Sequence, residues 1–184
     1  MKSLLSLAAL LAGQGTPDTA DAPLGTEDAQ AIVAEVLRYE AHRDFLLPNT
    51  CARRKSAGIS LSFPESVSGW RLPVLPPPEN SLERPTQPHP DTAQIQAAAA
   101  RGRADLRSEE SSMTMPADRI PASLRSDDPG CGSLRYSIPV VSQGIAFVDT
   151  IYSCGPLCAH GWRYALKRQD GRWQLIALGF AFIS

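Results

Sequence analysis

The sequence predicts an α+β domain in which an N-terminal amphipathic helix packs on a C-terminal antiparallel β-meander of three to four strands, with a long Pro-rich connection between them. Three observations support this class. Apolar residues recur at helical spacing over residues 26–44, prolines concentrate within 64–90, and residues 133–184 alternate as strands do around an Asp-Gly turn. A length of 184 residues fits one domain.

The helix predicted over 26–44 starts at a side chain that suits its N-terminus. The hydroxyl of Thr26 can accept a hydrogen bond from an unpaired amide of the first turn, so Thr26 is the expected N-cap. Residues 45–47 continue the apolar surface until Pro48 ends it. The apolar stripe expected to face the core is Ala29, Ile32, Val33, Val36 and Leu37.

The middle of the chain predicts less regular structure. Eight of the sixteen prolines lie in 64–90, and proline removes amide donors and disfavours helix before it, so this stretch is expected to be a loop. Residues 91–110 are alanine-rich and predict a helix. Because Ile95 and Leu106 are its only large apolar residues, we expect a surface helix that buries little.

The C-terminal region predicts strands at 133–141, 143–153, 162–169 and 172–183, with a turn at 154–161. Asp170-Gly171 between two apolar-patterned runs is a strong hairpin signal. As a two-residue loop it places Arg168 opposite Trp173, where the two can stack, and Trp162 opposite Gly179. The core face of this hairpin would then carry Trp162, Tyr164, Leu166, Trp173, Leu175 and Ala177, and the other face Arg163, Lys167, Arg172, Gln174, Leu178, Phe180 and Phe182.

The first residues resemble a secretory signal. Met1-Lys2 is a short basic start, residues 3–12 form an apolar run, and Ala20-Asp21-Ala22 has the form that signal peptidase cuts after. We therefore expect a signal peptide at 1–22, a single domain at 23–184 and a periplasmic or secreted protein. The apolar run is too short to span a bilayer and no cysteine follows it closely, so no membrane anchor is expected after cleavage.

Four cysteines agree with an oxidising compartment, namely Cys51, Cys131, Cys154 and Cys158. An even number in an exported chain indicates disulfides, with three possible connectivities. One of them joins Cys51, after the helix, to Cys131, before the sheet, and lets Cys154 pair with Cys158 across a turn. Cross-linking the long loop between Cys51 and Cys131 would stabilise the fold by about 4 kcal/mol.

The C-terminal string Cys154-Gly155-Pro156-Leu157-Cys158-Ala159-His160-Gly161, followed by Asp170-Gly171-Arg172-Trp173 and a terminal Ile183-Ser184, resembles a group of uncharacterised exported bacterial proteins. That group carries Cys-Gly-x-Leu-Cys-Gly-x-Gly, then Asp-Gly-x-Trp and a final Ile-Ser. Ala159 stands where that group usually has glycine. The resemblance covers about the last forty residues and implies export and fold, with no activity to carry over.

Candidate sites centre on the Cys-x3-Cys pair. A structural disulfide is favoured over a redox site, although His160 and Arg163 lie where they could lower a thiol pKa. A zinc site built from Cys154, Cys158 and His160, with Cys131 as fourth ligand, has only one suitable pair. No G-x-S-x-G elbow or phosphate-cradling glycine loop occurs. We therefore expect no cofactor, no resident metal and no catalytic residue, with His160 and Arg163 as the remaining functional candidates.

These observations favour a non-catalytic exported domain that binds a small ligand or a protein partner in the concavity between sheet and helix. A small periplasmic thiol-redox or metal-dependent enzyme using the Cys154/Cys158/His160 region is the alternative. Nucleic acid is not an expected partner, because the net charge is −1 and the pI is about 6.3.

Overall fold

A computed structural model of the chain describes residues 24–42, 50–55, 68–73, 87–105, 112–126, 130–155 and 157–183. The predicted signal peptide at 1–22, the apolar extension at 45–48, Leu106 and most of the Pro-rich stretch lie outside these ranges. The elements are α1 (Thr26–Ala41), β1 (Thr50–Ala52), β2 (Ser68–Arg71), α2 (Thr92–Asp105), the 3-10 turns η2 (Ala117–Arg119) and η3 (Ala122–Leu124), β3 (Gly132–Tyr136), β4 (Val140–Ser142), β5 (Ile145–Gly155), β6 (Cys158–Gln169) and β7 (Arg172–Ile183).

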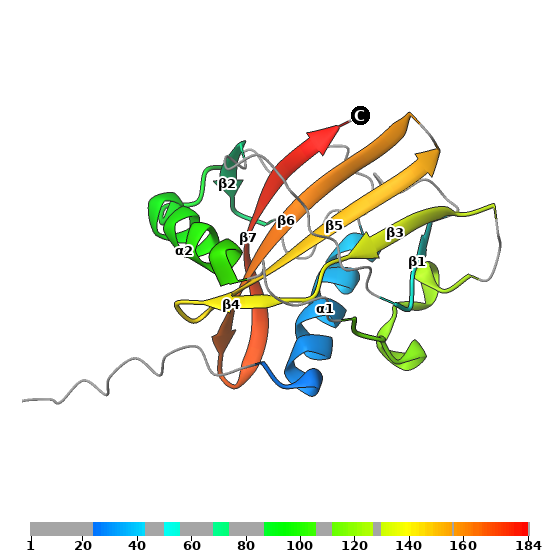
Figure 1. Cartoon of the computed structure of the whole chain (residues 1–184), viewed down its shortest axis with the longest axis horizontal. Coiled ribbons are helices and arrows are strands. Elements are labelled where there is room, and N and C mark those ends of the chain that lie inside the picture. Colours follow the sequence, from blue (N-terminus) through cyan, green and yellow to red (C-terminus); the bar gives the residue numbers. More distant parts are fainter. Residues whose placement is uncertain are drawn as a thin grey trace, which may run out of the picture.

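One mostly antiparallel sheet organises the described residues, with strand order β1-β3-β5-β6-β7-β2 and β4 paired with β5 (Figure 1). The α+β class is confirmed. The expectation of three to four strands is wrong, because seven strands join this sheet. Three of them are short strands outside the meander: β1 pairs in parallel with β3, β2 pairs with β7, and β4 forms a separate short hairpin with β5.

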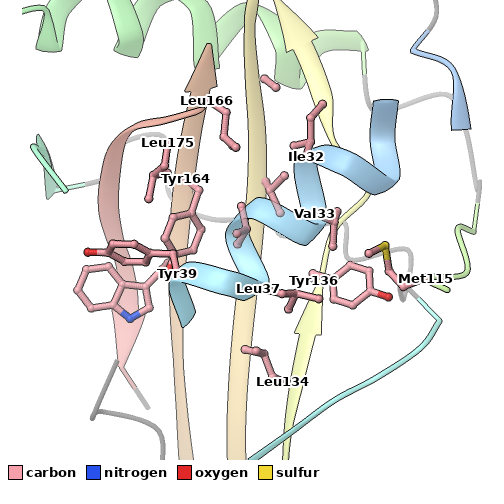
Figure 2. Close-up of a cluster of buried hydrophobic side chains, with 14 of the residues drawn as sticks. Ile32, Val33, Leu37, Tyr39, Met115, Leu134, Tyr136, Tyr164, Leu166 and Leu175 are labelled. Atoms are coloured by element: carbon pink, nitrogen blue, oxygen red, sulfur yellow. The ribbon is translucent and has the colours of Figure 1, made fainter. Parts of the chain in front are cut away.

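Helix α1 covers one face of the sheet. All five residues of the predicted stripe are buried, and Tyr39 and Glu40 extend it. Figure 2 shows Ile32, Val33 and Leu37 of the helix against Tyr164, Leu166 and Leu175 of the strands, in what we call the α1-side core. The N-cap differs from the prediction: it is Gly25, and Thr26 is the first helical residue.

Helix α2 lies over the opposite face and forms the α2-side core with Trp70, Phe147 and Ala165. The strands serve both cores by alternation, since Ala146 and Val148 face α1 whereas Ile145 and Phe147 face α2. The predicted surface helix is present but buries more than expected: Ile95, Ala98 and Ala99 are all buried. Trp70, from the Pro-rich stretch, donates from Nε1 to Gln96 Oε1 of α2 at 2.9 Å.

The predicted β6–β7 hairpin is confirmed near its turn. Asp170 and Gly171 have φ of 50° and 77°, as a type I′ turn requires, and Arg168 pairs with Trp173. A second turn of this kind, Gln143-Gly144 with φ of 54° and 72°, joins β4 to β5. Gln143 was expected within a strand, and the single strand expected over 133–141 is divided into β3 and β4.

The predicted register fails further along β7. The pairing steps from Leu166↔Leu175 to Ala165↔Ala177, so Ile176 is an extra residue on β7. Trp162 consequently pairs with Phe180, and Gly179 lies opposite Arg163. Because one extra residue reverses the faces beyond it, Ala177 joins the α2-side core, while Leu178 and Phe180 pack on the α1 side.

Candidate functional site

A cleft of about 960 Å³ runs along the face of α1 that points away from the sheet. One wall is the segment with η2 and η3, and Arg168 near the β6–β7 turn closes another side. The cleft is open to solvent. Its lining residues are Gly25, Glu27, Asp28, Ala31, Ala34, Arg38, Asp118, Arg119, Ile120, Pro121, Arg125 and Arg168. We call this the α1 cleft.

Local sequence explains how the α1 cleft is built. Ala31, Ala34 and Arg38 recur at helical spacing, so they share one side of α1. The facing wall is fixed by prolines, since Pro116 precedes η2 and Pro121 precedes η3, with φ of −58° and −53°. The buried side chains of Ile120 and Leu124 fasten this wall to the α1-side core.

Ion pairs line the rim of the cleft. Arg119 Nη2 lies 3.7 Å from Glu27 Oε1, and Arg38 pairs with Glu35 one turn earlier on the helix. Arg168 Nη2 lies 3.4 Å from Asp28 Oδ1, and its guanidinium carbon is 5.9 Å from the Trp173 ring centroid. The predicted stacking of Arg168 on Trp173 therefore forms part of the cleft's edge. Exposed pairs of this kind add little to stability, typically below about 1 kcal/mol.

His160, one of the two predicted functional residues, is buried on the α1 face of the sheet. Its ring packs on Tyr152, the residue opposite it on β5, with centroids 4.9 Å apart and planes 39° from each other. The expected turn at 154–161 is shorter than predicted, because β6 already begins at Cys158. His160 is thus a strand residue with an aromatic packing role.

Arg163, the other predicted residue, lies on the predicted face of the hairpin, opposite to that of Trp162 and Tyr164, but it is buried there. Only 4% of the residue is exposed. Its Nε and Nη2 donate to the two carboxylate oxygens of Asp149, both at 2.5 Å. Asp149 is the residue directly opposite on β5, so the two charges bridge neighbouring strands. Removing one partner of such a buried pair would leave the other charge uncompensated.

The structure does not bring His160 and Arg163 together. They are three positions apart on β6, so their side chains lie on opposite faces of the sheet, His160 with Tyr164 on the α1 side and Arg163 on the α2 side. The two predicted functional residues therefore do not share one site.

The cysteines whose side chains the structure describes are disulfide-bonded. Cys51 and Cys131 are bonded, with Cα atoms 5.9 Å apart, as one of the three connectivities predicted. Cys158 is also disulfide-bonded. Its predicted partner is Cys154, whose side chain lies outside the described part, so that pairing stays a prediction. Cys131 and Cys158 are thus unavailable as thiolate ligands for zinc, and the described residues hold no group of three or more metal-ligating side chains.

The buried carboxyl group of Glu40, beneath α1, was not predicted from the sequence. Glu40 is 3% exposed and accepts hydrogen bonds at Oε1 from Thr150 Oγ1 at 2.8 Å and from the Tyr164 hydroxyl at 2.5 Å. The Tyr39 ring packs edge-on against Tyr164. A signal was present, because Glu40 continues the stripe at i+4 from Val36.

Comparison of the chain with protein-family models, with curated proteins and with solved structures gives no match. Neither of the two described helices is long and apolar enough to cross a membrane. The disulfide between Cys51 and Cys131 is compatible with an oxidising compartment.

Proposed function

We propose that this chain is an exported, non-catalytic binding domain whose small ligand or protein partner binds in the α1 cleft. The observation that carries the proposal is the cleft itself, whose volume of about 960 Å³ falls in the range of ligand sites. It combines small and apolar side chains on its floor with charged groups on its rim, which is the mixture that such sites use to bind and to orient a ligand.

The buried polar groups favour binding over catalysis. His160 packs on Tyr152, Arg163 is held by Asp149, and Glu40 is held by Thr150 and Tyr164. Each of these groups is engaged in holding the sheet or α1 in place. The α1 cleft replaces the concavity between sheet and helix as the proposed binding site, because Glu40 and the apolar side chains of the α1-side core fill that interface.

Export is the second part of the proposal. Its support is the order of charge, apolar run and small-residue cleavage site in residues 1–22, together with disulfide use. The C-terminal resemblance to uncharacterised exported bacterial proteins agrees with it, and on that basis we propose a periplasmic or secreted location.

A protein-observed NMR fragment screen tests the binding site. We expect fragments to shift amide signals of residues 117–125 and of the outer face of α1. Ala31→Trp should abolish these shifts by filling the floor, whereas Ala97→Trp, at an exposed position of α2, should leave them unchanged. Fragments that bind elsewhere, or that bind the Ala31→Trp variant as well as the unmodified chain, would contradict the proposal.

A thiol-redox enzyme is the alternative function, and one observation favours it. Cys158 is exposed, whereas Cys51 and Cys131 are buried. Equilibration of the folded protein with thiol buffers separates the two functions. A reduction potential below about −300 mV for the Cys158 disulfide fits a structural bond, while a value between about −270 and −120 mV fits an oxidoreductase.

A further inference from the structure

The arginines of the α1 cleft differ in how they are neutralised. Arg38, Arg119 and Arg168 each have a carboxylate partner, in Glu35, Glu27 and Asp28 respectively. Arg125 is the exception: among the described residues, no carboxylate lies within ion-pair distance of its guanidinium. Arg125 is therefore the arginine of the cleft whose positive charge is available to a ligand.

Arg125 is also held in place by the backbone around it. Its Nε donates to the carbonyl oxygen of Ile120 at 2.6 Å, and its amide donates to the carbonyl oxygen of Ala122 at 3.1 Å. Leu124, immediately before it, is buried in the α1-side core. A guanidinium fixed through Nε binds a ligand with less loss of side-chain entropy than a freely rotating one.

The surroundings of Arg125 define the chemistry it can recognise. The two terminal nitrogens of a guanidinium match the two oxygens of a carboxylate and can bind them in parallel. Ala31, Ile120 and Pro121 line the same cleft and offer apolar contact. Asp118, also in the lining, disfavours a second negative charge on the ligand.

The geometry points to a ligand with one carboxylate and an apolar body, with the carboxylate bound to Arg125 and the body on Ala31, Ile120 and Pro121. This assignment rests on the proposed function of the cleft. A free organic acid and an acidic side chain of a peptide share this chemistry, and the probes below distinguish them.

Titration of the isotope-labelled protein with matched probe pairs tests the assignment. One pair is hexanoate and its neutral analogue hexanamide; the other is acetyl-Ala-Leu-Glu-Leu-Ala-amide and the same peptide with glutamine. In each pair that binds, we expect the carboxylate to bind about tenfold more tightly, a preference that weakens as salt is raised. The pair with the higher affinity identifies the source of the carboxylate.

Three variants assign the preference to one residue. Arg125→Gln should abolish the tenfold difference within the pair. Arg125→Lys, which keeps the charge but loses the planar fork, should retain only part of it. Arg135→Gln, an exposed arginine of β3 outside the cleft, should leave it unchanged.

Equal binding of acid and amide, or a preference that survives Arg125→Gln, would overturn the assignment. If fragments bind the α1 cleft but neither carboxylate probe does, the ligand class is wrong and the proposed function stands. If nothing binds the cleft, the proposed function fails together with the assignment.

Discussion

Among single residues, Glu40 does most to fix the position of α1 on the sheet. Its carboxyl group accepts hydrogen bonds from Thr150 on β5 and Tyr164 on β6, so one side chain joins the helix to two central strands. Hydrogen bonds in a site with little water are stronger than in solution, and the cost of leaving a buried group unpaired is correspondingly high. The angle at which α1 crosses the sheet therefore depends on this contact as well as on apolar packing.

Tyr164→Phe should lower the free energy of unfolding by about 1.5–3 kcal/mol, because it removes a hydrogen bond to a buried carboxyl group. In a Glu40→Ala background the same substitution should cost much less. Urea unfolding of the two single variants and the double variant gives the coupling energy. An equal cost of Tyr164→Phe in both backgrounds would show that the contact contributes nothing specific.

Tyr136 makes the free energy of unfolding depend on pH in the alkaline range. Burial raises the pKa of its phenol well above the ordinary value, an effect that the nearby charge of Arg54 partly offsets, and the hydroxyl donates to the Arg54 carbonyl oxygen at 2.9 Å. In the unfolded chain tyrosine ionises near pH 10. The stabilisation is therefore complete below about pH 10 and is lost as pH rises further, since the unfolded chain then binds fewer protons than the folded one.

Measured from pH 9 to pH 11.5, the free energy of unfolding should fall more steeply for the unmodified chain than for Tyr136→Phe. Above pH 10 the difference in slope should approach about 1.4 kcal/mol per pH unit. Leu134→Ala, at a buried side chain of β3 that does not titrate, serves as the control. Parallel curves for the unmodified chain and Tyr136→Phe would contradict this assignment.

At the scale of elements, the features set by neighbouring residues could be predicted from the sequence. The adjustments that one element makes to another could not. The Asp170-Gly171 turn and the α1 stripe follow from residue type and spacing within a few positions. The extra residue Ile176 does not, because a bulge depends on how β7 bends between two covered faces. That one residue moved Ala177 from the predicted core face to the other core and brought Leu178 and Phe180 to the α1 side.

The disulfides belong to this scale because they connect elements. Cys51 lies on β1 and Cys131 just before β3, 80 positions further along the chain. Replacing both by serine should lower the free energy of unfolding by about 4 kcal/mol, since the bond restricts a long loop of the unfolded chain. Replacing Cys154 and Cys158 should cost only about 2 kcal/mol, because their predicted loop is short. Chemical denaturation of both pair variants checks the order, and the reverse order would contradict it.

Across the whole molecule, the sheet is covered on both faces, which sequence reasoning did not anticipate. The alanines of α2 indicated a helix with little to bury. In the structure, the small side chains of these alanines let α2 approach the sheet closely, and the large side chains of Trp70 and Phe147 fill the space between them. Even Gly102 of α2 has no room to spare, since a Cβ there would lie 3.1 Å from Val140 Cγ1. The sequence does not show which small residues of α2 will face which large residues of the sheet, so this fit could not be predicted from it.

The α1 cleft was beyond prediction for a similar reason. Its wall at 117–125 has no periodic pattern, and its two proline-initiated turns become informative only when Ile120 and Leu124 are seen fastened to the α1-side core. Arg125 carries no motif that would mark it. Its selection as a ligand-binding residue depends on a backbone hydrogen bond and on the placement of charges from α1.

The place of β7 in the sheet also has a consequence for when the protein can fold. This strand is the last described element to leave the ribosome, yet it lies between β6 and β2 and supplies Leu175 and Leu178 to one core and Ala177 to the other. Until it has been synthesised, the sheet lacks the strand that joins β2 to β6. Neither core can therefore be completed before β7 has been added to the sheet.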